Sequence, residues 1–195
     1  MPPPPPKSGF PTWAIVLIAT LGTIVLLVVV MGVLAFAGMR SYVSASKTAE
    51  ATNSVGEISR SAIDAYDRES MSSGLLSAGA TTGVTTHQLC GSASHPVPIS
   101  ISAVSARKYQ SAMSDWGGSP TDGWECLRFE MVSPQYYQYD YKATGSGKVG
   151  DSYTASAKGD LDGDGKTSSF TITGRVSSGD IIIADPTPKV VDANE

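Results

Sequence analysis

The sequence is poor in the side chains that most often carry catalysis. Its 195 residues include two histidines and two cysteines, and 16% of them are charged. His87 and His95 are the only candidates for a general base at neutral pH, and both lie in loop-like sequence near Cys90. The chain also lacks the G-x-S-x-G, H-E-x-x-H and phosphate-loop motifs. We therefore expect a protein without enzymatic activity.

Basic residues are in the minority. The chain carries 14 lysines and arginines against 18 aspartates and glutamates, which gives a net charge of −4. Proteins that bind nucleic acid usually concentrate positive charge on one surface. This balance predicts that nucleic acid is not a partner.

The two cysteines, Cys90 and Cys126, leave two alternatives, a disulfide or a pair of buried thiols. A structural zinc site would need both histidines as well, and the cysteines form no C-x-x-C pair. A disulfide is favoured if this part of the chain lies outside the cytoplasm. The chain-entropy argument gives about 4 kcal/mol for closing a loop of this size.

Charge is absent from one long stretch, residues 13–39. As a helix these residues would extend about 40 Å, enough to cross a hydrocarbon core of about 30 Å. The apolar part of a cleaved signal peptide is shorter, about 7–15 residues. We predict a single-pass transmembrane helix over residues 13–39. Residues 1–12, which are rich in proline, are expected to form a cytoplasmic flank or leader that is too short to be a domain.

The helix is predicted to continue beyond the membrane. Residues 40–69 contain no proline, and Val55, Ile58, Ala62 and Tyr66 recur at steps of three and four. This spacing places them on one face of a helix, with the charged residues elsewhere. Residues 40–70 are therefore expected to form an amphipathic continuation whose apolar stripe packs on a partner surface.

The remaining residues, 71–195, predict a globular head rich in strands. Residues 71–86 are small and polar and are expected to form a loop. Alternation of apolar and polar residues predicts strands over residues 99–103, 127–131, 137–141, 153–157 and 170–176. A turn over residues 177–180 is expected to lead into a returning strand over residues 181–183. The strands over residues 127–131 and 137–141 are expected to pair as a hairpin, and the tail, residues 186–195, to be irregular. The predicted fold class is α+β, with one long helix laid on an antiparallel sheet.

One loop of the head has the composition of a cation site. Asp160, Asp162, Asp164 and Gly165 form a D-x-D-x-D-G pattern, which is the first half of a calcium loop, and the carbonyl of Lys166 could join it. The twelfth position is Thr171 rather than the glutamate of an EF-hand, and the flanking residues predict strands. Calcium is the candidate ligand, and the alternative is an acidic turn without metal.

Several segments resemble type IV pilins and pseudopilins. SKTAE, residues 46–50, with Ala51 and Gly56, resembles the start of the amphipathic half of the pilin helix. GWECLRFEMVSPQYYQYDYKATG, residues 123–145, and AKGDLDGDGKTSSFTITGRV, residues 157–176, resemble the globular part of pilin-like proteins of myxobacterial type. The resemblance extends from about residue 39 to the C-terminus, with the segments in the same order.

The N-terminal end departs from this family. Prepilins carry a short basic leader that ends in glycine before a phenylalanine, and a glutamate five residues into the mature chain. KSGF, residues 7–10, resembles this junction, with the candidate cleavage site between Gly9 and Phe10. Pro11 follows, and Ala14 stands in place of the glutamate that is thought to align an incoming subunit with its neighbour. The sequence leaves both a cleaved leader and a permanent anchor open.

The resemblance implies a structural subunit anchored in the bacterial inner membrane, with its C-terminal domain in the periplasm. Its expected partners are other pilin or secretion-system subunits, and its expected role is that of a minor component of a type IV pilus or a type II secretion pseudopilus. The alternative is a membrane-anchored periplasmic binding domain that does not polymerise and that depends on calcium if the aspartate loop holds the ion.

Overall fold

The computed structural model describes residues 11–68 and 87–193. The candidate leader junction at Gly9 and Phe10 and the whole of the predicted loop, residues 71–86, lie outside these residues. The chain forms two compact units, Met1–Ala45 and Ser46–Glu195. Helix α1 (Thr12–Asp67) contributes residues to both units.

Helix α1 contains 56 residues, as the uninterrupted hydrophobic and then amphipathic pattern predicts. It begins directly after Pro11, whose carbonyl oxygen accepts a hydrogen bond from the Ala14 backbone N–H at 2.9 Å. Proline is well suited to this position because it lacks the N–H that the first turn of a helix leaves unpaired. The single long helix is confirmed.

The described part of the second unit adds the following elements in chain order: η1 (Ile101–Ala103), η2 (Met113–Trp116), β1 (Gly118–Ser119), α2 (Gly123–Leu127), β2 (Gln138–Thr144), β3 (Ser152–Gly159), β4 (Ser168–Ser177), β5 (Ile181–Ala184) and β6 (Lys189–Val191). Strands β2, β3, β4 and β5 pair antiparallel with their sequence neighbours. Strand β6 pairs antiparallel with residues 169–171 of β4, which precede the residues of β4 that pair with β5. These pairings confirm the α+β class and four of the predicted strands.

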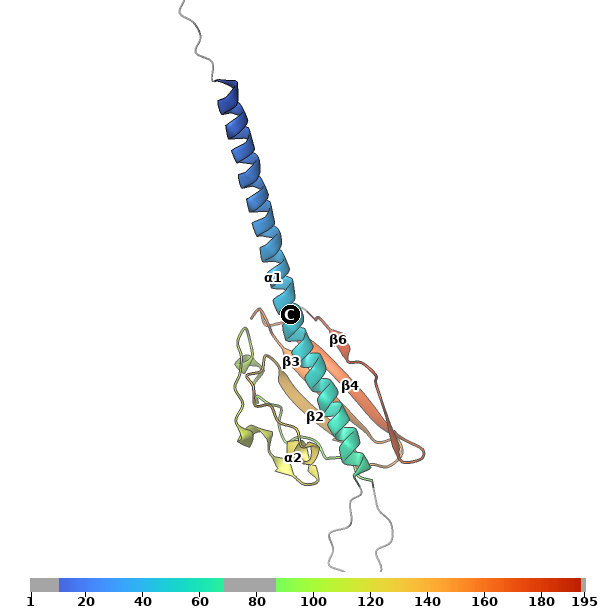
Figure 1. Cartoon of the computed structure of the whole chain (residues 1–195). Helices are drawn as coiled ribbons and strands as arrows, with labels where there is room; N and C mark the ends of the chain where they lie inside the picture. Colours follow the sequence, from blue (N-terminus) through green and yellow to red (C-terminus); the bar gives the residue numbers. More distant parts are fainter. Residues whose placement is uncertain (1–10, 69–86, 194–195) are drawn as a thin grey trace, which may run out of the picture. The chain divides into compact units, whose positions relative to one another are not determined.

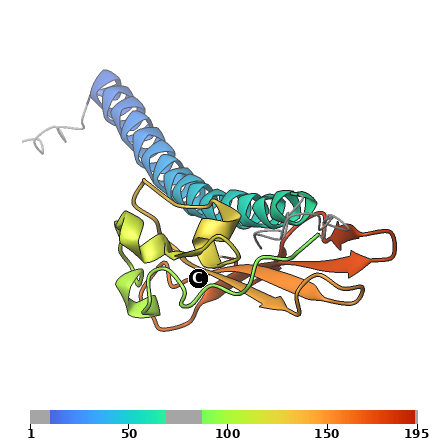
Figure 2. The same ribbon diagram turned by 90° about the horizontal axis from the view of Figure 1, so that it is seen from below.

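The amphipathic part of α1 lies over one face of this sheet (Figures 1 and 2). Val55, Ile58, Ala62 and Tyr66 are all 0% exposed, as their spacing predicts. The Ser59 hydroxyl lies 2.7 Å from the Tyr153 hydroxyl of β3, and the Tyr66 hydroxyl donates to the Gly147 carbonyl at 3.1 Å. The stripe and the sheet therefore share one core.

Aromatic side chains supply the sheet side of this core. Tyr139 and Tyr141 of β2, Tyr153 of β3 and Phe170 of β4 are at most 1% exposed, because alternate residues of each strand point to the same face. Gly174 makes room for them, since a Cβ atom there would lie 2.3 Å from Cε1 of Tyr153.

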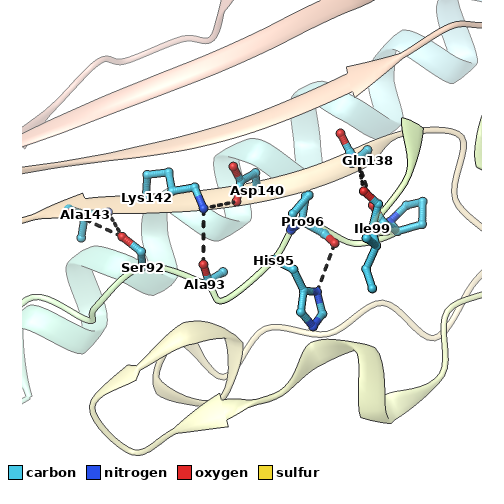
Figure 3. Close-up of polar contacts among 10 residues, drawn as sticks. Ser92, Ala93, His95, Pro96, Ile99, Gln138, Asp140, Lys142 and Ala143 are labelled. Carbon is cyan, nitrogen blue, oxygen red and sulfur yellow. Dashed lines mark hydrogen bonds and ion pairs between the residues drawn. The ribbon is translucent and has the colours of Figure 1, made fainter. Parts of the chain in front are cut away.

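The edge of β2 that does not pair with β3 is covered by the chain that precedes η1. Val97 and Tyr139 exchange backbone hydrogen bonds at 2.8 Å in both directions. Figure 3 shows the next contacts along this edge, where the Ser92 hydroxyl accepts from the Ala143 N–H at 2.9 Å and Lys142 Nζ lies 3.4 Å from the Ala93 carbonyl oxygen. The covered edge leaves no row of unpaired strand groups at this point, which protects against aggregation.

Two predicted strands are wrong. Residues 99–103 contain the 3-10 helix η1, and Ile99 is 73% exposed, so the alternation there did not reflect burial. Residues 127–131 begin with the last residue of α2 and do not pair with β2, although Leu127 and Phe129 are buried and Arg128 is exposed. That alternation arises where the helix ends in a left-handed residue, Arg128, and Phe129 turns inward against Trp116 and Trp124.

The C-terminal tail is also more regular than predicted. Residues 189–191 form β6, in which Val190 pairs with Phe170 of β4. The two prolines of the tail, Pro186 and Pro188, precede this strand and so cost it no ladder hydrogen bond. Beyond it, the Ala193 carbonyl oxygen accepts a hydrogen bond from the Thr48 hydroxyl at 3.2 Å.

Candidate functional site

The first candidate is the apolar surface of α1 in the first unit. Residues Thr12–Phe36 have a mean hydropathy of 3.0 and none of the 18-residue window behind this value is buried. These 25 residues would extend about 37 Å as a helix, which is enough to cross a membrane. The described helix is thus long and apolar enough to act as a single membrane span.

Two threonine hydroxyls of this segment are satisfied within the helix. The Thr20 hydroxyl lies 3.0 Å from the Val16 carbonyl oxygen, and the Thr23 hydroxyl lies 2.9 Å from that of Ala19. A hydroxyl without a partner would be costly in hydrocarbon, where water cannot replace it. These bonds make the segment compatible with lipid on all sides.

The predicted disulfide between Cys90 and Cys126 is present. It joins the extended chain beside β2 to helix α2, with a sequence separation of 36 and a Cα–Cα distance of 5.8 Å. Both cysteines are buried, at 1% and 8% exposure. The bond ties the loop-rich half of the second unit together, where β-ladders are short.

The carboxylate of Glu50, which has no sequence signature of a site, joins α1 to the sheet. Glu50 Oε1 accepts hydrogen bonds from the Tyr136 backbone N–H at 2.8 Å and from the Tyr139 hydroxyl at 3.2 Å. The ammonium groups of Lys47 and Lys108 lie 4.8 and 4.7 Å from the centre of the Tyr136 ring. These contacts fix the start of β2 against the helix.

Burial raises the pKa of Glu50 above its ordinary value of 4.5. The hydrogen bonds from Tyr136 and Tyr139 and the charge of Lys108 oppose this effect, because each of them favours the charged carboxylate. Burial and the nearby Glu50 charge in turn raise the pKa of the Tyr139 hydroxyl, which stays protonated and able to donate. Glu50 therefore links α1 to Tyr136 and Tyr139 through a carboxyl group that can be titrated.

The three aspartates of the candidate calcium loop do converge. Asp160, Asp162 and Asp164 each offer a carboxylate oxygen, and these oxygens lie within 4.8 Å of one another. Asp160 is buried, and the other two are exposed. The loop connects β3 to β4, so strands flank it, as the sequence predicts. Three converging carboxylates could hold a hard cation such as calcium.

The same carboxylates are engaged within the loop. Asp160 accepts from the Ser105 hydroxyl at 2.7 Å, from the Gly163 N–H at 2.7 Å and from the Gly165 N–H at 3.3 Å. The bond from Ser105 is the largest cause of the lowered pKa of Asp160. Asp164 pairs with the Lys166 ammonium at 2.8 Å. These bonds also suit an acidic turn that needs no metal, so the geometry fits both alternatives.

The histidines lie apart from one another and serve local contacts. His87 Nδ1 lies 2.9 Å from the Tyr66 carbonyl oxygen, and its ring stacks on that of Tyr66 at 5.3 Å. His95 Nδ1 lies 3.3 Å from the Pro96 carbonyl oxygen (Figure 3). Within the described residues no hydrogen bond joins either ring to a hydroxyl or thiol nucleophile, and Cys90 is held in the disulfide.

No family model matches this chain, no curated protein matches it in sequence, and no solved structure matches its fold. The resemblance to pilins therefore remains an expectation from sequence.

Proposed function

We propose that this chain is a structural subunit of pilin type, anchored in the bacterial inner membrane by the first part of α1. The disulfide-bonded head would lie in the periplasm, and the subunit would join a type IV pilus or a type II secretion pseudopilus as a minor component. Its partners would be other subunits of the same assembly.

The contrast between the two parts of α1 is the main support for this proposal. Residues 12–36 are apolar and exposed, whereas Val55, Ile58 and Ala62 of the same helix are buried under the sheet. An exposed apolar surface of this length needs lipid or other apolar helices around it. A helix that couples such a surface to a folded head is what a subunit needs if it waits in a membrane and then packs into a helical bundle.

The disulfide supports the placement of the head. Structural disulfides form and persist outside the cytoplasm, and the periplasm is an oxidising compartment. Cys90 and Cys126 are paired and buried in the head. A head on the periplasmic side would acquire this bond during export.

Four measurements test the proposal. The chain should stay in the membrane fraction after alkaline carbonate extraction, and a C-terminal alkaline phosphatase fusion should be active, since that enzyme needs an oxidising compartment. Intact mass should give a mature chain that begins at Phe10, and sheared extracellular filaments should contain it. A chain released by carbonate would refute the anchor, and an inactive fusion would refute the orientation.

Matched variants isolate the leader. Gly9→Leu should retain residues 1–9, because it changes the residue before the candidate cleavage site, whereas Ser8→Ala should be processed normally. Pro11 and Ala14 favour a second candidate function, a permanently anchored periplasmic domain. If the wild-type chain keeps residues 1–9 and is absent from sheared filaments, this second function replaces the first.

A further inference from the structure

A small cavity in the second unit lies between the end of α1 and the disulfide. It has a volume of about 220 Å³, and its lining includes Arg68, Gln88, Thr121, Cys126 and Arg128. None of the described residues that line it carries a carboxylate. The cavity thus combines two positive charges with neutral hydrogen-bonding groups.

One of the two arginines is held firmly in place. The Arg68 guanidinium donates a hydrogen bond to the carbonyl oxygen of Cys126, the residue that forms the disulfide with Cys90. Arg68 is half-buried, and Ala65, one turn earlier on α1, lines the same cavity. Because the disulfide fixes the far wall and α1 fixes the near wall, the guanidinium is oriented before any ligand arrives.

The other arginine is placed by an unusual backbone conformation. Arg128 follows α2 with φ 55° and ψ 40°, a left-handed conformation that is uncommon for residues with a side chain. Such conformations occur at the C-terminal ends of helices and also at functional sites. Here the conformation ends the helix and leaves Arg128 on the rim of the cavity, exposed to solvent.

The two arginines place two positive charges on the same cavity. Burial lowers the pKa of Arg68, the positive charge of Arg128 lowers it further, and Asp64 acts in the opposite direction. No ion pair within 4.0 Å joins either arginine to a carboxylate among the described residues. Two guanidinium groups that repel each other across a shared cavity are stabilised by a negative charge placed between them.

We propose that this cavity binds a small oxyanion, a phosphate or carboxylate group, between the guanidinium groups of Arg68 and Arg128. Guanidinium groups match these oxyanions because their planar N–H donors can contact two oxygens at once. The Gln88 amide and the Thr121 hydroxyl supply further donors on the wall. The proposal does not depend on whether the chain polymerises.

Calorimetric titration of the full chain in a nonionic detergent tests this site. Inorganic phosphate is one probe and succinate is the other, with sodium chloride adjusted to hold the ionic strength constant, because surface charge alone gives a salt-dependent signal. We expect saturable binding of at least one probe with a dissociation constant on the order of 1 mM or tighter. Phosphate alone would identify a phosphoryl ligand, and succinate alone a carboxylate.

Variants assign the binding to the two arginines. Arg128→Gln should weaken binding about tenfold or more, since it removes one charged donor from an exposed rim position. Arg68→Lys keeps the charge in the buried wall and should also weaken binding, because lysine lacks the bidentate donor. The control is Arg175→Gln, an exposed arginine of β4 that does not line the cavity. No saturable binding of either probe, or equal binding by wild type and Arg128→Gln, would overturn the site.

Discussion

Glu50 provides a direct test of what holds α1 to the sheet. Its carboxylate is the shared acceptor for the Tyr136 backbone N–H and the Tyr139 hydroxyl. Tyr139 is 0% exposed, so loss of the acceptor would leave a buried hydroxyl and a backbone donor with poorer partners. We predict that Glu50→Ala lowers the free energy of unfolding of the head by about 2 kcal/mol, the usual cost of unsatisfied buried polar groups.

Glu50→Gln should raise the free energy of unfolding of the head at neutral pH. The glutamine Oε1 can accept the same two hydrogen bonds, and the neutral side chain avoids the burial of a charge that raises the pKa of Glu50. A carboxyl group whose pKa is higher in the folded state binds more protons there than in the unfolded state. Its contribution to stability is therefore fully present below the ordinary value of 4.5 and is lost as pH rises through the raised pKa.

The assay is thermal and urea unfolding of the full chain in detergent, followed by the fluorescence of the buried Trp116 and Trp124 between pH 4 and pH 8. As pH rises, the free energy of unfolding of Glu50→Gln should increase relative to that of the wild type. Glu57→Gln is the matched control, because Glu57 is an exposed glutamate of the same helix. A Glu50→Ala variant as stable as wild type, or a wild-type minus Glu50→Gln difference that is constant with pH, would contradict this account.

Three further changes test other parts of the structure. Replacement of both Cys90 and Cys126 by alanine should lower the free energy of unfolding by about 4 kcal/mol, the chain-entropy value for a 36-residue separation, and an equally stable variant would show that the bond is not structural. Ile58→Ala should cost about 3 kcal/mol in urea unfolding, because it opens a cavity at a fully buried position, and a loss below 1 kcal/mol would mean that the stripe is not packed as described. Asp160→Ala should lower the thermal midpoint even in chelator, because it removes the acceptor for Ser105 and two backbone N–H groups. Excess calcium should raise the wild-type midpoint if the ion offsets repulsion among the three carboxylates, and an unchanged midpoint would exclude calcium at this loop.

The parts of the fold that repeat a local pattern could be predicted from sequence. The stripe at Val55, Ile58 and Ala62 is set by helical geometry alone, and strands β2 to β4 show the alternation of a sheet with one buried face. Residues 127–131 show the limit of this reasoning. Phe129 is buried there by an aromatic cluster at the end of a short helix, which produces the same alternation without a strand.

The candidate sites were harder to predict because they depend on contacts between distant residues. The aspartate loop has a sequence signature, but the engagement of Asp160 by Ser105, 55 residues earlier, has none. Arg68 and Arg128 likewise line one cavity only because Arg68, just after α1, reaches the carbonyl of Cys126, 58 residues along the chain. No periodicity marks such pairs, since they are set by tertiary packing rather than by local geometry.

The contact between Ser59 and Tyr153 has a consequence for the order in which the protein folds. These residues are separated by 94 positions, and Glu50 is separated from Tyr136 by 86. At a synthesis rate of about 5–20 residues per second, the apolar stripe of α1 is made roughly 5–20 s before the strand that covers it. During that interval the nascent chain presents an uncovered hydrophobic helix face, and chaperone binding to nascent chains should be strongest before residue 153 emerges and fall sharply after it.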